Sequence, residues 1–202
     1  MKLYYSPGAC SLSPHIVLRE AGLPFTLELA STKTHKLADG TDYYSINPKG
    51  YVPLLELDDG QRLTEGPAIV QYIADRVPDK KLVAPWGSME RYRQLEWLTF
   101  IGTEIHKSFS PLFNPASSDE LKNLSRTRLG QRLQWVDTQL AGKPYLGGDG
   151  FAVTDAYLFV VTNWSNFVQV DIGALANVKA FLERVAARPS VQAAMKAEGL
   201  IK

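Results

Sequence analysis

Apolar and polar positions in the first 80 residues follow patterns that predict a small mixed α/β domain. Residues 3–5 favour a short strand. Apolar residues at three- and four-residue spacing then predict a helix over 11–22, with Ser11 as N-cap and Gly22 as stop signal. Alternation over 25–29 predicts a second strand with one buried face. These elements form a strand–helix–strand unit.

The next part of the chain predicts a β-hairpin followed by a helix. Two strand-like runs, 52–57 and 61–64, flank an Asp-Asp-Gly turn, and the polar stretch before them predicts an irregular connection with one short helical turn. A helix begins near Glu65, with Pro67 in its first turn, and ends before Pro78. We therefore expect a thioredoxin-like domain over residues 1–80, with a mixed sheet covered by helices.

The rest of the chain is predicted to be helical after a linker over 81–87. Ser88 is the N-cap candidate of a long helix to about Phe109, and further helices are expected over 119–140, 153–164, 175–185 and after Arg188. Residues 153–164 are apolar nearly all round, which places this helix at the centre of a bundle. The predicted fold is an α/β N-terminal thioredoxin-like domain plus an all-α C-terminal helical bundle domain over 88–202.

Two faces of the helix over 88–109 differ in character. The residues Tyr92, Thr99, Thr103 and His106 cluster within roughly 60° of arc, which indicates either a solvated face or a binding face. An apolar stripe on the same helix, and another on the helix over 119–140, should face the core: Leu95, Leu98, Ile101, Ile105 and Phe109, then Leu121, Leu124, Leu129, Leu133, Val136 and Leu140.

Composition and charge exclude several classes of partner. The formal charge is +1, from 22 basic and 21 acidic residues that are interspersed, so no basic patch for nucleic acid or an anionic membrane is expected. No apolar run has the length of a signal peptide or a membrane span, so we expect a cytoplasmic protein. The three histidines, His15, His35 and His106, are too scattered to indicate a metal site.

The single cysteine, Cys10, is the strongest candidate for chemistry. It lies between the first strand and the start of the first helix, where the helix dipole should lower the thiol pKa from its ordinary value of roughly 8.5. Ser13 occupies the position of the second cysteine in a Cys-x-x-Cys pair, so any disulfide must form with another molecule, and glutathione is the most compatible small thiol. The alternative is a buried cysteine that acts as a small apolar side chain.

Five motifs in a fixed order carry a family resemblance. They are Tyr-x-x-Pro-Gly-Ala-Cys-Ser at 4–11, Pro-Lys-Gly-Tyr-Val-Pro at 48–53, Leu-Thr-Glu at 63–65, Thr-Asp-Ala-Tyr at 154–157 and Arg-Pro at 188–189. With them, the whole chain resembles the glutathione S-transferases, and its first motif is similar to that of the bacterial beta class. The family begins its central helix with a Ser/Thr-x-x-Asp capping box. In this chain Ala152 occupies the first position, so only the Asp155 half of the box is present.

The resemblance implies a glutathione site built from named positions. It implies that Cys10, Ser11 and His106 act at the glutathione sulfur and that Tyr5 lines the cleft. It also implies that the Val52–Pro53 bond is cis, with the Val52 backbone on the cysteinyl part, and that Glu65 meets the γ-glutamyl ammonium. Gly66 stands where many members have serine, and His35 where a lysine often reaches the glycyl carboxylate. Thr99, Thr103, Glu104 and Lys107 are the further contacts, some of them from a partner subunit.

The implied activity is that of a glutathione transferase, which conjugates the glutathione thiol to hydrophobic electrophiles in detoxification. Glutathione is then the co-substrate, the enzyme is a homodimer, and no metal, nucleic acid or membrane takes part. Two alternatives remain open: one depends on the same residues, and the other has no catalytic site. The first is a glutathione-dependent thiol–disulfide oxidoreductase or dehalogenase that depends on Cys10. The second is a non-catalytic interaction protein with the transferase fold.

Overall fold

The computed structural model describes residues 1–202 and divides them into two units. Unit 1 contains residues 1–83 and 188–202, and unit 2 contains residues 84–187. The division near residue 83 lies in the expected linker. The last segment departs from the expected helical domain over 88–202, because its helix packs against the first helix of unit 1.

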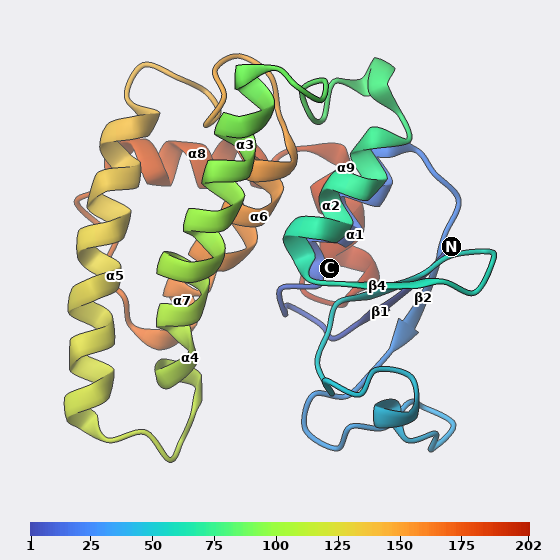
Figure 1. Ribbon diagram of the computed structural model, residues 1–202. Helices are drawn as coiled ribbons and strands as arrows, with labels where there is room; N and C mark the ends of the chain where they lie inside the picture. Colours follow the sequence, from blue (N-terminus) through green and yellow to red (C-terminus); the bar gives the residue numbers. More distant parts are fainter. The chain divides into compact units, whose positions relative to one another are not determined.

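Unit 1 contains a four-stranded mixed sheet with the strand order β2-β1-β3-β4 (Figure 1). The strands are β1 (Lys2–Tyr5), β2 (Thr26–Leu29), β3 (Leu54–Glu56) and β4 (Arg62–Thr64), with β1 parallel to β2 and antiparallel to β3. Leu3 pairs with both Leu27 and Leu55 and is completely buried. The expected buried face of β2 is only partly formed, since Leu29 remains exposed on this edge strand.

Three helices accompany the sheet in unit 1: α1 (Leu12–Ala21), α2 (Gly66–Asp75) and α9 (Pro189–Ala197). The helix α1 packs against both α2 and α9, and its predicted apolar stripe is buried. It ends at Gly22, whose φ of 68° lies in the left-handed region that favours glycine. Short 3₁₀ turns occupy Tyr43–Ser45, inside the connection predicted to be irregular, and Pro78–Lys80.

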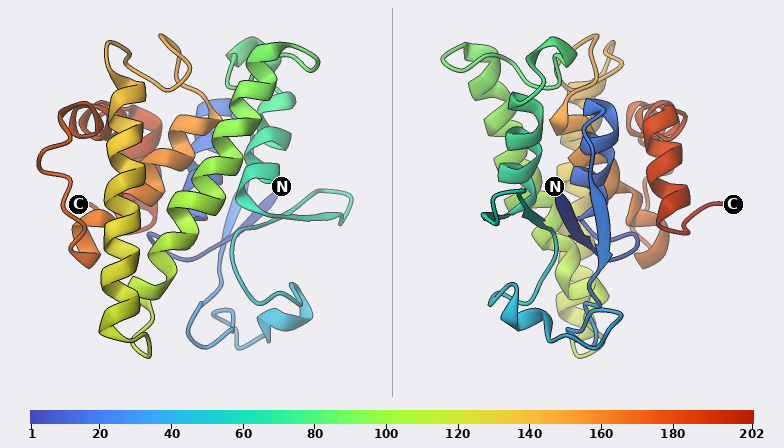
Figure 2. Two further views of the ribbon diagram at one scale, coloured as in Figure 1. Left: turned by 60° about the vertical axis from the view of Figure 1, so that its left-hand side comes forward. Right: turned by 90° about the vertical axis from the view of Figure 1, so that its right-hand side faces the viewer.

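Unit 2 is all-helical, as the sequence predicts (Figure 2). Its central helix is α6, where all residues from Val153 to Thr162 are buried. This helix packs against α3, η3, α7 and α8, which confirms its predicted place in the bundle. The elements are α3 (Met89–Phe100), the π-helical segment η3 (Ile101–His106), α4 (Lys107–Phe113), α5 (Asp119–Leu140), α6 (Val153–Asn163), α7 (Ser165–Val168) and α8 (Ala176–Ala186).

The predicted helix over 88–109 is present, but it changes its winding in the middle. Ser88 caps α3 by accepting a hydrogen bond from the Arg91 N–H, and the chain then passes through η3 into α4 without a break. Such π-helical turns are rare and occur often at functional sites. An i to i+5 turn holds more residues than an α-turn and shifts the faces of the helix, which the α-helical spacing of the sequence does not reveal.

Three of the leucines predicted to face the core do not. Leu95 on α3 is 40% exposed, and on α5 the values are 43% for Leu121 and 65% for Leu124. On α5 (Asp119–Leu140) the buried stripe runs through Leu129 and extends toward the N-terminal end as far as Ser125. Leu124 lies about 140° from Leu129 at 100° per residue, so it faces away from the bundle.

The start of α6 has half of a capping box. Asp155 accepts a hydrogen bond from the Ala152 N–H at 2.9 Å, while Ala152 has no side-chain acceptor to return one. The other oxygen of Asp155 accepts from the Leu146 N–H at 2.9 Å. Ala152 has the extended backbone of an N-cap, with φ −134° and ψ 174°, so a hydroxyl at this position would point toward the N–H groups of the first turn.

Ala152→Thr should therefore stabilise unit 2. The hydroxyl supplies the missing acceptor of the box, and we expect the free energy of unfolding to rise by roughly 0.5 to 2 kcal/mol. Ala152→Val is the matched control, because valine has the same shape without the acceptor. Thermal unfolding of both variants decides the point, and equal stability of the two would show that the hydroxyl is not used.

Candidate functional site

Cys10 lies in a tight turn directly ahead of α1. Its carbonyl accepts hydrogen bonds from the Ser13 N–H at 3.1 Å and the Ser13 hydroxyl at 2.9 Å, which fixes the chain at the helix start. The thiol is partly exposed and its Sγ lies 3.4 Å from the Val52 carbonyl oxygen, to which it donates. The Val52–Pro53 bond is cis, as the resemblance implies. The structure thus brings Cys10, Val52 and Pro53 together.

Ser11 has a different role from the predicted one. Its side chain is completely buried, and its hydroxyl accepts from the Ser6 N–H at 3.1 Å and donates to the Ser6 carbonyl at 3.2 Å. It makes no capping bond to α1. The hydroxyl therefore closes the loop that holds Cys10, and its only proton is already donated within the protein.

Glu65 stands at the N-terminus of α2 in a conformation that is rare for a residue with a side chain. Its φ is 71°, and its carboxylate Oε1 accepts from Lys49 Nζ at 2.8 Å and from the Tyr51 hydroxyl at 2.7 Å. These hydrogen bonds raise the pKa of Lys49 and the pKa of Tyr51. Backbone strain of this kind is common where a side chain is held for binding. Glu65 and the start of α2 therefore form a polar, partly exposed edge of unit 1.

Gly66, the first residue of α2, leaves room for a side chain. A Cβ added there would have Ser13 Oγ as its nearest neighbour at 3.9 Å, which is ordinary contact. Its backbone N–H belongs to the first turn of the helix, where N–H groups have no partner within the helix and attract anions. A carboxylate is the natural ligand for this position.

His35 lies on the connection after β2, in the left-handed region with φ 52°. Its Nδ1 is 2.9 Å from the Gly50 carbonyl oxygen and its ring centroid is 4.7 Å from that of Tyr44. A carbonyl can only accept, so Nδ1 carries a proton, and the neutral imidazole presents Nε2 as an acceptor. Gly50 is required here, because its φ is 72° and a Cβ would lie 2.4 Å from the Tyr44 ring.

A buried carboxylate links the end of the chain to the Cys10 loop, and sequence analysis did not find it. Glu198 accepts from His15 Nδ1 at 2.8 Å and from the Gly8 N–H at 3.0 Å, and the side chains of Glu198 and His15 are both completely buried. Arg19 Nε donates to His15 Nε2 at 2.9 Å. The signal for this contact in the sequence was His15, a polar residue on the apolar face of α1.

Tyr5, expected to line the cleft, packs beside this buried pair. Its ring centroid is 6.4 Å from that of His15. Burial raises the pKa of Tyr5, and the negative charge of Glu198 raises it further. Tyr5 is thus placed by the same network that holds the Cys10 loop.

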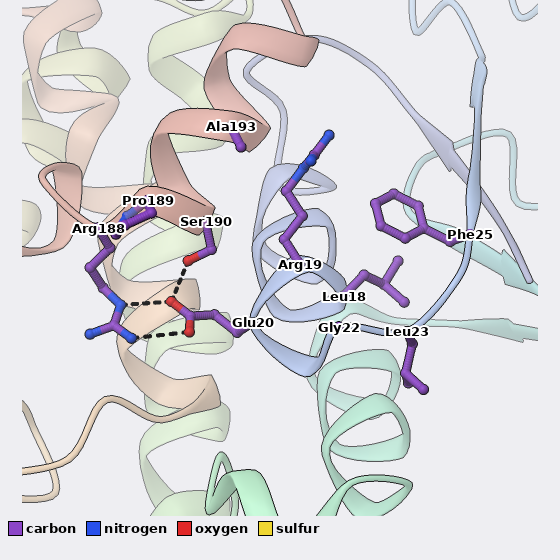
Figure 3. A pocket seen from close by; sticks show the side chains of 10 residues that line it. All are labelled: Leu18, Arg19, Glu20, Gly22, Leu23, Phe25, Arg188, Pro189, Ser190 and Ala193. Atoms are coloured by element: carbon purple, nitrogen blue, oxygen red, sulfur yellow. Dashed lines mark hydrogen bonds and ion pairs between the residues drawn. The ribbon is translucent and has the colours of Figure 1, made fainter.

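A pocket of about 600 Å³ between α1 and α9 has none of the predicted site residues in its lining (Figure 3). Its polar centre is Glu20, which accepts hydrogen bonds from Arg188 Nε at 2.7 Å, from Arg188 Nη2 at 3.0 Å and from the Ser190 hydroxyl. Burial alone would raise the pKa of Glu20, but the hydrogen bonds from Arg188 and Ser190 lower it. This cluster joins α1 to α9 and offers no unused carboxylate oxygen to a ligand.

The predicted site residues of unit 2 lie on α3, η3 and α4. The hydroxyls of Thr99 and Thr103 are exposed and donate to the carbonyls of Leu95 at 2.8 Å and Thr99 at 3.0 Å. Glu104 is already engaged by α5: its Oε2 accepts from Arg128 at 3.0 Å and from Arg132 at 2.9 Å. These bonds lower the pKa of Glu104.

Lys107 is the exposed first residue of α4 and follows His106 directly. His106 is the last residue of η3, and its Nδ1 lies 2.6 Å from the hydroxyl oxygen of Tyr157 on α6. The indole ring of Trp164 stands edge-on to the imidazole at 5.0 Å. His106 is thus held between a buried phenol and an aromatic ring.

No group of three or more His, Cys, Asp or Glu side chains is placed to hold a metal ion. None of the helices combines the length and the apolar character needed to cross a membrane.

Unit 1 has the features of a thioredoxin-like thiol protein. A strand–helix–strand unit, an antiparallel hairpin and a closing helix follow one another, with the cysteine ahead of α1 and the cis-proline at its sulfur. An all-helical unit follows this unit in the same chain.

Comparison with known proteins gives the family. Models of the N-terminal and C-terminal domains of glutathione S-transferase match residues 8–76 and 100–189. The chain is 49% identical over 200 residues to glutathione S-transferase GstA of Escherichia coli O157:H7, covering 99% of this chain and 100% of the relative. The chain belongs to the glutathione S-transferase family.

Two solved structures agree with this assignment. A bacterial beta class glutathione S-transferase from Sphingomonas chungbukensis has a TM-score of 0.96 and is 48% identical, with 100% of both chains covered. A sphingomonad glutathione S-transferase complexed with glutathione has a TM-score of 0.95 and is 46% identical, also with 100% of both chains covered.

The buried Glu198 predicts a large effect of its removal. Glu198→Ala leaves the Gly8 N–H and His15 Nδ1–H without acceptors, and we expect a loss of roughly 2 to 5 kcal/mol in the free energy of unfolding. Glu183→Ala, at an exposed position on α8, is the control and should change stability by less than about 0.5 kcal/mol. Chemical denaturation measures both, and similar losses would contradict a structural role of Glu198.

Proposed function

We propose that this protein is a glutathione transferase that conjugates the glutathione thiol to hydrophobic electrophiles and so serves detoxification. The observation that carries the proposal is the position of Cys10, whose Sγ lies at the Val52 carbonyl beside the cis-proline and ahead of α1. Family membership and the glutathione complex of a relative that matches the whole chain support the choice of thiol.

The tripeptide is proposed to lie along unit 1. Its γ-glutamyl carboxylate meets the N–H groups that open α2 at Gly66, and its ammonium replaces Lys49 at Glu65. The cysteinyl backbone pairs with Val52 as an added strand would. His35 reaches the glycyl carboxylate, and because Nδ1 is bound to Gly50, it does so as a donor only when Nε2 is protonated.

The proposed reaction is attack of the glutathione thiolate on the electrophile. The sulfur forms the new bond with the electron pair of the thiolate, and the leaving group departs with the pair of the broken bond. Hydrogen-bond donors near the sulfur stabilise the thiolate, and His106 is proposed as one of them. Cys10 lies beside the bound sulfur, and its own reaction is thiol–disulfide exchange. Ser11 contributes by holding the Cys10 loop through Ser6.

The electrophile is proposed to bind against unit 2. Trp164 packs edge-on against Phe109 and Phe113, each at 5.6 Å between ring centroids, and Phe113 is half exposed. The exposed ring of Phe113 contacts Trp164, which also packs against His106, and it suits a hydrophobic co-substrate. No metal enters this mechanism.

The active form is proposed to be a homodimer in the cytoplasm. Exposed apolar side chains on α3 and α5, among them Leu95, Leu121, Leu124 and Trp135, support contact with a second copy. In this assembly Thr99, Thr103 and Lys107 are available to a tripeptide, whereas Glu104 acts through its ion pairs with α5. A reducing compartment keeps Cys10 and glutathione as thiols.

Gly66→Ser tests the proposed place of the γ-glutamyl carboxylate. The side chain fits, and its hydroxyl adds one donor, so the dissociation constant for glutathione should fall about 3- to 10-fold. Gly66→Ala is the matched control, since it changes the helix start in the same way without the donor. Calorimetric titration of both variants measures the difference, and equal affinities would remove Gly66 from the site.

Cys10→Ala separates conjugation from disulfide exchange. Oxidised glutathione should add one glutathione to the wild type by forming a Cys10–glutathione disulfide and releasing one glutathione thiolate, because the chain has no second cysteine to resolve it. Intact mass spectrometry should show this adduct in the wild type and not in the variant.

The same variant should keep most of its conjugation rate, because the substrate carries its own sulfur. A panel of halogenated aromatics and epoxides measures this rate. Complete loss of conjugation would mean that Cys10 is indispensable, and absence of the adduct in the wild type would exclude a redox role.

A further inference from the structure

Tyr157 provides a polar contact of His106 within unit 2. The phenol is on α6, is 3% exposed, and its hydroxyl oxygen lies 2.6 Å from His106 Nδ1. The two rings stand nearly perpendicular, at 83° and 5.8 Å between centroids, and Trp164 closes another side of the imidazole. Packing and the hydrogen bond to Tyr157 therefore hold the imidazole in one orientation.

The chemistry of the two groups indicates which atom carries the proton. The hydroxyl of a phenol is a good hydrogen-bond donor and a weak acceptor, whereas the unprotonated nitrogen of an imidazole is a strong acceptor. These preferences favour the Tyr157 hydroxyl as the donor and His106 Nδ1 as the acceptor of their 2.6 Å contact. A neutral imidazole that accepts at Nδ1 carries its proton on Nε2.

The other two histidines of the chain are held in the opposite tautomer. Arg19 Nε can only donate, so His15 accepts at Nε2 and carries its proton on Nδ1, which points at Glu198. His35 carries its proton on Nδ1 because the Gly50 carbonyl can only accept. His106 is thus the single histidine whose partner is placed to fix the proton on Nε2.

We propose that Tyr157 is a positioning residue that fixes His106 in the Nε2–H tautomer, so that His106 serves the reaction as a hydrogen-bond donor and not as a base. Its bearing on catalysis rests on the proposed function. With Nδ1 engaged by the phenol and Nε2 already protonated, the neutral ring has no site that accepts the thiol proton. It stabilises a thiolate that already exists.

Nuclear magnetic resonance tests the tautomer without any substrate. Protein labelled with nitrogen-15 histidine is recorded at about pH 8, above the ordinary pKa of histidine, in an experiment that correlates ring nitrogens with ring protons. Such spectra distinguish the two tautomers, and the variants His35→Gln and His106→Gln assign the signals. We expect Nδ1–H for His15 and His35 and Nε2–H for His106.

Tyr157→Phe keeps the ring and removes the donor. The His106 signals should then change to those of a tautomer mixture, while His15 serves as the internal control and stays unchanged. An Nδ1–H pattern for His106 in the wild type would overturn the proposal, as would an unchanged His106 pattern in Tyr157→Phe. The wild-type spectrum decides the assignment even where the variant does not fold.

Kinetics test the role in the reaction. Tyr157→Phe should lower kcat for conjugation about 2- to 10-fold with little change in KM for glutathione, the size expected for one hydrogen bond. His106→Gln offers an amide donor and should retain more activity than His106→Ala. Equal losses in these two variants would overturn the donor role. A wild type without conjugation activity would contradict the proposed function, while the spectrum alone decides the tautomer.

Discussion

The buried carboxylate of Glu198 is the interaction on which unit 1 depends. It accepts hydrogen bonds from the His15 ring and from the Gly8 N–H, and the side chains of Glu198 and His15 are both fully buried. An ionised group removed from water is tolerated only when its oxygens are hydrogen-bonded. The same contact joins the last segment of the chain to the loop two residues ahead of Cys10. Together with the contacts of Glu20 to Arg188, it holds residues 188–202 in unit 1.

In unit 1, the polar groups proposed for the tripeptide already have partners within the protein. Cys10 donates to Val52, Glu65 accepts from Lys49 and Tyr51, and His35 donates to Gly50. Binding therefore exchanges one set of hydrogen bonds for another, so each contact adds less than its gross energy. In return, the side chains are already held near their binding positions, so less conformational entropy is lost when the ligand binds.

Periodic and local signals in the sequence predicted most of the fold. Gly22, Pro67 and Ser88 mark helix ends because their effects are confined to one turn of backbone, and the structure confirms all three. The position of the cysteine before α1 followed from the strand and helix signals around it. The cis bond at Pro53 was implied by the family resemblance, and the structure shows it.

The features that sequence reasoning missed depend on contacts between distant residues. The Ser11 hydroxyl hydrogen-bonds to Ser6 and does not cap α1. Glu104 forms ion pairs with two arginines of α5. Glu198 contacts His15, which is 183 residues away in the sequence. The π-helical turn before His106 is also invisible to a search for α-helical spacing. Such partners are chosen by tertiary packing, so a linear pattern does not specify them.

A crystal structure of this protein with glutathione tests the central claim most directly, namely that unit 1 holds the tripeptide with its sulfur at Cys10. The account predicts the γ-glutamyl group at Glu65 and Gly66, the cysteinyl backbone on Val52, and the glutathione sulfur beside Cys10 Sγ. A tripeptide bound away from α2, or one whose sulfur points away from Cys10, would contradict it.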